Sequence, residues 1–160
     1  MFVREAFPDE MDVAGELRVA AYQAQNLLAM NPAYAKTLRA LGTAGDGEVL
    51  VAVEDGQLLG TVMLQPWHPS CEVARSADEA EIRALAVAPE AQGRGVGGTL
   101  LRVVLDRAAA RGVRHMVLST QPANVAAQRL YLAEGFTRIP DRDWTPVPGL
   151  TLLAFGRPLA

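Results

Sequence analysis

A glycine-rich segment between an apolar segment and an amphipathic one places the strongest constraint on this chain. Residues 81–88, Glu-Ile-Arg-Ala-Leu-Ala-Val-Ala, have the composition of a buried strand, and a helical apolar stripe runs from about Thr99 to Gly112. Between them, four glycines occur within residues 93–98. Because glycine adopts positive φ angles readily, the N–H groups of such a turn can converge on one point. The sequence therefore predicts a strand, a turn and a helix with an anion site at the turn.

Other features of the same segment also favour an anion. Gln92 and Arg94 can donate hydrogen bonds, and no acidic residue occurs between Ala91 and Val104. The first turn of the following helix adds unpaired N–H groups and the positive end of the helix dipole. We therefore expect a pyrophosphate here. The residues predicted to hold it are Gln92, Gly93, Arg94, Gly95, Val96, Gly97 and Gly98.

Two common phosphate-binding motifs fit this segment incompletely. The glycines of residues 93–98 have the spacing of the dinucleotide fingerprint, but that motif needs an acidic residue at the end of the next strand, where residues 118–121 read Leu-Ser-Thr-Gln. The nucleoside-triphosphate loop ends in Gly-Lys followed by Ser or Thr, and residues 97–99, Gly-Gly-Thr, lack the lysine. Each motif thus lacks the residue that defines it.

The motifs between residues 79 and 139 resemble those of the GCN5-related N-acetyltransferase family in kind and order. The family signature, Gln/Arg-x-x-Gly-x-Gly/Ala, is matched by residues 92–97, which follow a Glu-Ile-x-x-Leu-x-Val strand. Asn124, Leu130-Tyr131 and Gly135-Phe136 come after them, as in the family. The resemblance implies that the loop holds the pyrophosphate of acetyl-CoA and that the pantetheine arm pairs with the preceding strand. It adds five cofactor-binding residues: Leu85, Ala86, Val87, Asn124 and Ala127.

The resemblance also implies the fold: an α/β domain with a mixed, mostly antiparallel sheet, one parallel strand pair and helices on both faces. We expect one domain over residues 1–160. A capping box at residues 9–12 begins a first helix that ends by Asn31, and Asp55-Gly56 is a favoured hairpin turn. The other helices expected are 33–41, 99–111 and 124–134. The strands expected are 1–6, 48–54, 57–65, 79–88, 113–120, 136–140 and 150–156, with 79–88 and 113–120 as the parallel pair.

Composition excludes several classes of protein. Half of the 160 residues are apolar, but no run of 18 apolar residues and no basic, apolar leader occurs, so a cytoplasmic protein without a membrane segment is expected. A net charge of −3 gives no nucleic-acid footprint. The single cysteine, Cys71, excludes an internal disulfide, and two histidines do not make a zinc set. Cys71 lies in the loop that also holds His68, where nucleophilic catalysis is not expected, and His115 is interpreted as structural.

Transfer of an acyl group to an amine needs a proton acceptor, because an alkyl ammonium with a pKa of about 10.4 is not a nucleophile. Glu81 is the candidate, since alternation along the strand places it on the same face as Val87. It also stands eleven residues before the loop glutamine, where some members of the family have a catalytic glutamate. A water path to a base and a solvated, non-catalytic Glu81 remain alternatives. Glu72, Asp78 and Glu79 are substitutes.

Tyr131 is the candidate donor of a proton to the departing thiolate. It lies seven residues after Asn124, on nearly the same face of one helix, and both match the family's spacing. A tyrosine in such a position can also be an ordinary core residue.

Candidate residues for the acceptor site come from two sources. In the resembled family the segment that joins the first two helices forms one wall of that site, which implies Tyr22, Asn26 and Tyr34. Trp67, Asp141 and Trp144 lie in segments that would border the cleft, and aromatic and acidic residues suit an amine. Ordinary packing is the alternative for each of them.

The resemblance therefore implies an N-acetyltransferase that moves the acetyl group of acetyl-CoA to a primary amine by direct attack in a ternary complex. The acceptor is a small-molecule amine, or a protein N-terminus or lysine. A non-catalytic sensor that binds acetyl-CoA is the alternative, and an NAD-dependent oxidoreductase lacks its carboxylate. No metal and no nucleic acid is expected, and a homodimer is left open.

Overall fold

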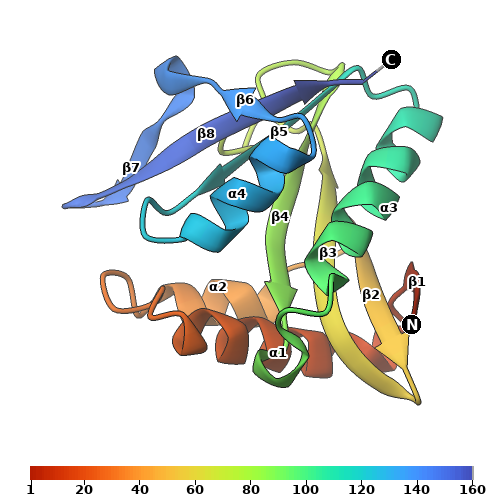
Figure 1. Cartoon of the computed structure of the whole chain (residues 1–160). Helices are drawn as coiled ribbons and strands as arrows, with labels where there is room; N and C mark the ends of the chain where they lie inside the picture. The colour runs from red at the N-terminus through yellow and green to blue at the C-terminus, as the bar shows by residue number, and fades with distance from the viewer. Residues whose placement is uncertain (160) are drawn as a thin grey trace.

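The computed structural model describes residues 1–159 and is built on one mixed sheet (Figure 1). Its strands lie in the order β1-β2-β3-β4-β5-β8-β6, and β7 pairs with β8. Within the described residues, β4 and β5 are the one parallel pair. The predicted fold class is confirmed. The strands are β1 Phe2–Glu5, β2 Glu48–Glu54, β3 Gln57–Pro66, β4 Glu79–Val87, β5 His115–Thr120, β6 Thr137–Arg138, β7 Trp144–Val147 and β8 Leu150–Pro158. The helices are α1 Met11–Ala24, α2 Tyr34–Ala40, α3 Val96–Ala110 and α4 Val125–Ala133, with 3-10 turns η1 Pro8–Glu10, η2 Pro89–Ala91 and η3 Pro140–Arg142.

The helices cover both faces of the sheet. Side chains along a strand alternate between the faces, so neighbouring residues of one strand pack against different helices. On β2, Leu50 and Ala52 are buried in the core cluster that contains the apolar stripe of α3. Val49, the residue before Leu50, is buried in a second cluster with Leu38 of α2 and with Leu41, which follows α2. The central strands are therefore apolar on both faces.

Local turn chemistry gives the structure that the sequence predicts at several points. Asp55 and Gly56 have φ angles of 52° and 76°, the positive values that a two-residue hairpin turn between β2 and β3 requires. Asn124 caps α4, and its side chain accepts a hydrogen bond from the Ala127 amide at 3.3 Å. Gly112 and Gly135 end α3 and α4 with φ angles of 81° and 89°.

Helix α3 begins at Val96, three residues before the expected start. Gly95, in the left-handed region, precedes it as the N-terminal cap, so Gly97 and Gly98 belong to the first turn of the helix. A Cβ atom on Gly97 would lie 3.3 Å from the Leu130 side chain of α4. These glycines therefore let the start of α3 approach α4 closely. Helix propensities disfavour glycine, so they do not predict a helix at this position.

Helix α1 is shorter than expected, because it ends at Ala24 and Asn26 takes a positive φ of 57°. Asparagine tolerates this conformation, which stops a helix. The capping interaction also differs from the prediction. The Phe7 amide donates a hydrogen bond to the Glu10 carboxylate at 2.8 Å. The capping box predicted between Asp9 and Asp12 is therefore replaced by a contact between residues 7 and 10.

The C-terminal strands differ from the expected pair 136–140 and 150–156. Strand β6 contains only Thr137 and Arg138, and β5 begins two residues late, at His115. A further strand, β7, pairs with β8 around Gly149, whose φ is 82°. Its proline, Pro146, favoured an irregular connection in the sequence, but proline is tolerated in such an edge strand.

Candidate active site

Strands β4 and β5 separate after a short parallel stretch. They pair only along residues 79–81 and 115–117, although β4 continues to Val87 and β5 to Thr120. Beyond this stretch β4 carries a bulge against β3, and Ala84 takes a positive φ of 50°. A bulge bends a strand and redirects its side chains, and such features are frequent beside active sites.

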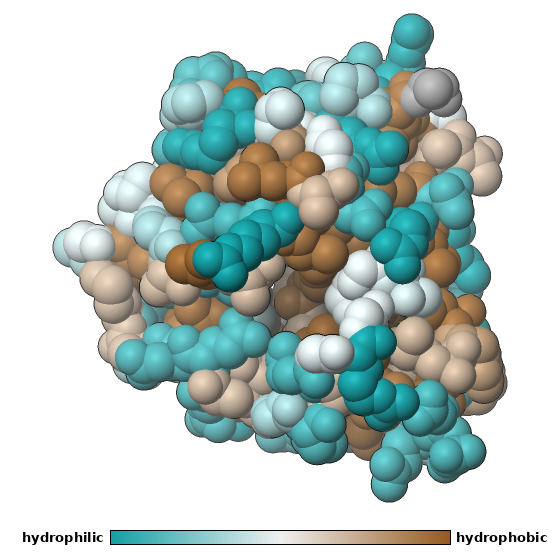
Figure 2. Space-filling view, viewed as in Figure 1, coloured by the Kyte–Doolittle hydropathy of each residue, from teal (hydrophilic) through white to brown (hydrophobic). Residues whose placement is uncertain are grey.

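Two cavities lie where the strands part. The loop groove, of about 340 Å³, lies between residues 85–87 of β4, residues 91–98 and the start of α4. The inner cavity, of about 250 Å³, lies between residues 81–85, the end of β5, the segment from α1 to α2 and strands β7 and β8. Four residues line both cavities: Tyr22, Leu27, Leu85 and Asn124. The cavities are therefore adjacent, and Figure 2 shows a hollow in the middle of the face that it draws.

The loop groove has the properties of an anion site. Gly93 and Gly95 have φ angles of 77° and 79°, and the space in which their Cβ atoms would lie is open. Helix α3 begins directly after them, so its unpaired N–H groups and positive dipole end lie at this turn. Among the described residues, no Asp or Glu lines the groove.

Two side chains of this loop make contacts that the sequence does not predict. The Gln92 amide donates to the Val87 carbonyl oxygen at 2.9 Å, which ties the loop to the end of β4. Arg94 forms an ion pair of 2.6 Å with Glu54 in the β2–β3 hairpin, and it does not line the groove. The groove therefore relies on main-chain N–H groups.

Glu81 is held at the wall of the inner cavity by main-chain amides. It is 1% exposed, and its Oε1 accepts hydrogen bonds from the amides of Val73 and of Ala74, the latter at 2.6 Å. Its Oε2 makes no hydrogen bond within residues 1–159. Glu81 lines the inner cavity, and one oxygen of its carboxylate therefore has no protein partner there.

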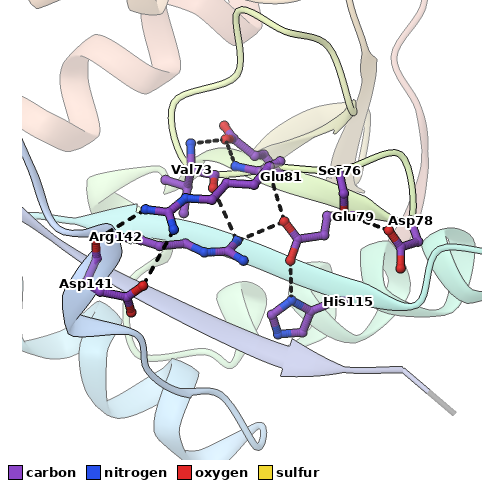
Figure 3. A network of polar contacts seen from close by, with 10 residues as sticks. Val73, Ser76, Asp78, Glu79, Glu81, His115, Asp141 and Arg142 are labelled. Carbon is purple, nitrogen blue, oxygen red and sulfur yellow. Dashed lines mark hydrogen bonds and ion pairs between the residues drawn. The ribbon is translucent and has the colours of Figure 1, made fainter.

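A network around Glu79 holds the loop that supplies these amides (Figure 3). Glu79 Oε1 accepts hydrogen bonds from the Arg75 amide and from Arg142 Nη1, each at 2.8 Å, and Oε2 lies 2.6 Å from His115 Nδ1. Arg142 also donates to the Val73 carbonyl oxygen at 3.3 Å. Burial alone would raise the pKa of Glu79, but the hydrogen bonds from Arg142, His115 and Arg75 outweigh it and lower the pKa. His115 therefore contacts Glu79 at the start of the parallel pair, and it does not line the inner cavity.

Glu72 is a second acidic residue of the inner cavity. Burial raises its pKa, and the nearby Glu81 acts in the same direction, while Arg83 opposes both. Arg83 Nε lies 3.3 Å from Glu72 Oε1. Glu72 therefore stands near Glu81 as an alternative proton acceptor.

Tyr131 reaches the inner cavity from α4 and is 6% exposed. Its ring packs against Phe136 and Phe155, with centroids 5.8 and 6.1 Å away. Burial raises the pKa of its phenol, so the hydroxyl keeps its proton at neutral pH. Tyr131 combines a core position with a hydroxyl that can donate.

The predicted acceptor residues divide into two groups. Tyr22, Tyr34 and Trp144 line the inner cavity. Three others do not line it: Asn26, Trp67, which is 38% exposed, and Asp141, which lies 3.5 Å from Arg75 in an ion pair. Further polar residues line the inner cavity that no sequence motif indicated: Asn31, Thr37, Ser119, Thr120 and Gln121.

No group of His, Cys, Asp or Glu in the described residues could hold a metal ion. None of the helices described is long and apolar enough to cross a membrane.

The family follows from a comparison of the sequence with known families. Residues 15–136 match the model of the acetyltransferase (GNAT) family. The chain belongs to this family. The predictions of the family, of its enzyme class and of acetyl-CoA as the cofactor that GNAT acetyltransferases use are thereby confirmed.

The proteins that this chain resembles carry the names of different acetyltransferases. A mycothiol acetyltransferase of Cellulomonas flavigena is 38% identical over 92 residues, which are 56% of this chain and 26% of that protein. This GNAT chain spans only about a quarter to a third of such relatives. Ribosomal-protein-alanine N-acetyltransferase from Brucella melitensis has the same fold, with a TM-score of 0.74 at 23% identity over 99% of this chain and 100% of that one. A Salmonella typhimurium structure with its cofactor acetyl-CoA has a TM-score of 0.71 at 22% identity, over 100% and 94%.

Proposed function

We propose that this GNAT chain moves the acetyl group of acetyl-CoA directly to a primary amine bound in the inner cavity. One observation carries the proposal: the groove at the glycine-rich loop shares four lining residues with the adjacent cavity, which Glu81 and Tyr131 line. A thioester bound with its diphosphate at residues 92–98 and its arm along residues 85–87 would reach this junction. The amine and the thioester would then meet in one ternary complex.

The residues of the loop groove support acetyl-CoA as the donor. The open space at Gly93 and Gly95 gives a diphosphate access to the main-chain N–H groups of residues 93–98 and the start of α3. Leu85, Ala86 and Val87 line the groove beyond, where a pantetheine arm would lie against β4, and Asn124 and Ala127 line the opposite side. When bound, acetyl-CoA supplies the activated acyl group.

Glu81 would take the proton that an ammonium must lose before it attacks. Its Oε1 is held by two amides, so Oε2 is the oxygen available for the proton. The amine nitrogen forms the new bond to the acetyl carbon as the carbon–sulfur bond breaks. Glu72, whose pKa burial raises, is the alternative acceptor of the proton.

Tyr131 would donate a proton to the sulfur as it leaves. Because burial keeps the phenol protonated, its O–H can donate to the sulfur as negative charge develops there. Tyr131 lines the inner cavity and Asn124, seven residues earlier, lines both cavities. This arrangement would place cofactor binding and proton donation on one helix.

The test is acetyl-CoA turnover with a panel of primary amines, followed by release of the free thiol and by mass spectrometry of the acetylated product. The panel should include small amines, amino acids and peptides with a free N-terminus or lysine, since relatives are named for mycothiol and for ribosomal-protein alanine. Acetylated product is expected for at least one class. Tight acetyl-CoA binding without turnover on any amine would instead favour a sensor.

A further inference from the structure

Arg83 contributes the one cationic side chain among the described residues that line the inner cavity. The other charged groups there are Glu72 and Glu81. The Arg83 side chain is only 11% exposed, so its charge has lost most of its contact with water. A buried guanidinium is costly unless carboxylates or other acceptors compensate it.

Two other arginines of the chain each pair with a carboxylate through two short hydrogen bonds. Arg4 donates to both oxygens of Glu10 at 2.7 and 2.9 Å, and Arg138 donates to both oxygens of Asp143 at 2.7 Å each. These side chains are 25% and 33% exposed, so they are less buried than Arg83. Such two-point contacts are the strongest that a guanidinium makes with a carboxylate.

Arg83 has no contact of this kind. Its Nε lies 3.3 Å from Glu72, in an ion pair without hydrogen-bond geometry. Its Nη1 and Nη2 donate to the neutral oxygens of Gln65 at 3.2 Å and of Tyr34 at 3.4 Å. Four N–H groups lie on the two Nη atoms, so two of them have no hydrogen-bond acceptor among the described residues.

The position of Arg83 relative to Glu81 suits a ligand with two opposite charges. One residue separates them on β4, before the bulge, so their side chains share a face of the strand. Their Cα atoms are roughly 6.6 Å apart. An ammonium near Glu81 and a carboxylate near Arg83 would each face an opposite charge. The inner cavity, at about 250 Å³, is smaller than the roughly 300 to 1,000 Å³ of sites for drug-sized ligands, so the ligand is small.

We propose that the acceptor is a small amine that carries a carboxylate a few bonds away, as an amino acid does, and that Arg83 binds this carboxylate. The inference rests on the proposed function, because it names the acceptor of the same cavity. Arg83 is then the residue that selects the acceptor, while Glu81 acts on its ammonium. A simple cationic amine, or a peptide N-terminus without a nearby carboxylate, would leave the guanidinium without its ligand.

The test compares α-, β- and γ-amino acids, each with its own carboxamide. For the preferred chain length, kcat/KM of the acid is expected to exceed that of the carboxamide at least tenfold. In Arg83→Gln the preference should fall to about threefold or less, through a higher KM for the acid and an unchanged KM for the carboxamide. Arg83→Lys should keep part of it. Arg39→Gln is the matched control, because Arg39 is exposed on α2 and pairs with Glu16; it should keep the full preference.

Binding provides a readout that does not depend on turnover. Calorimetry of each acid and its carboxamide against the chain saturated with CoA should show the same preference and its loss in Arg83→Gln, and CoA affinity in each variant checks that the fold is intact. Equal use of carboxamides, a better peptide acceptor, or an unchanged preference in Arg83→Gln would overturn the role of Arg83 while acetyl transfer itself stands. If no amine is acetylated, the proposed function is refuted. The calorimetric comparison of acid and carboxamide would then still show whether Arg83 binds a carboxylate.

Discussion

Glu81 Oε1 lies 2.6 Å from the main-chain nitrogen of Ala74, a residue of the loop before β4. With the second amide, from Val73, this contact fixes the carboxylate at the wall of the inner cavity. The loop is held in turn by Glu79 and Arg142, of which the first lies two positions before Glu81 on β4. Glu79 therefore holds the loop in place, and the loop holds the Glu81 carboxylate.

This relationship makes Glu81→Gln an informative change. The amide oxygen of glutamine can still accept from Val73 and Ala74, so the local structure should survive while the proton acceptor is lost. We expect kcat to fall about 100-fold or more, as for the loss of a general base, with unchanged acetyl-CoA affinity. Thiol release and calorimetry measure the two quantities.

Glu72→Gln is the matched comparison for Glu81, since both residues line the same cavity. It should lower kcat less than Glu81→Gln does. A larger loss in Glu72→Gln would transfer the role of base to Glu72.

Tyr131→Phe removes one hydroxyl from α4 and keeps the ring that packs on Phe136 and Phe155. Stability and acetyl-CoA affinity should therefore change little. Turnover should fall, by roughly 100-fold if the phenol supplies the proton to the thiolate. The measurement is kcat at saturating acetyl-CoA, together with a thermal unfolding curve, and unchanged turnover would remove Tyr131 from the mechanism.

Gly95→Asp tests the loop. The substitution adds a negative charge where a diphosphate is expected and strains a residue with φ of 79°. CoA binding should be lost in calorimetry. Gly112→Asp is the control, because Gly112 has nearly the same φ, 81°, and equally open space, but lies at the other end of α3. Normal affinity in Gly95→Asp, or equal loss in both variants, would contradict the assignment of the loop.

The fold was predictable where the chemistry of neighbouring residues decides the structure. Asp55-Gly56 can form only a few turns, and Asn124 has a free helix N–H group within reach of its side chain. The start of α3 was not predictable, because Gly97 and Gly98 read as turn residues until the nearness of Leu130 is known. Strand β7 was missed for a similar reason, since pairing with β8 outweighs its own proline.

The candidate site was predictable at the loop and along β4, where the motifs name the residues, although the bulge at Ala84 interrupts the alternation from Glu81 to Val87. It was not predictable where partners are distant in sequence. Arg94 reads as an anion donor, but Glu54, forty residues earlier, holds its side chain. Arg83 is an ordinary strand residue in the sequence, and only the folded chain brings Glu72 and Tyr34 to it.

Glu79→Gln should reduce stability in a pH-dependent way. The folded pKa of Glu79 lies below its ordinary value of 4.5, so its contribution is present above pH 4.5 and is lost as pH falls through the lowered value. At pH 7 the substitution weakens the hydrogen bonds to Arg142 and His115 and should cost about 1 to 3 kcal/mol. Urea unfolding of both proteins from pH 7 to pH 3 should show this difference shrinking on the acid side. Glu16→Gln, which breaks an exposed pair with Arg39, should cost less than about 1 kcal/mol. A difference for Glu79→Gln that stays constant to pH 3 would show that its charge does not hold the loop beside Glu81.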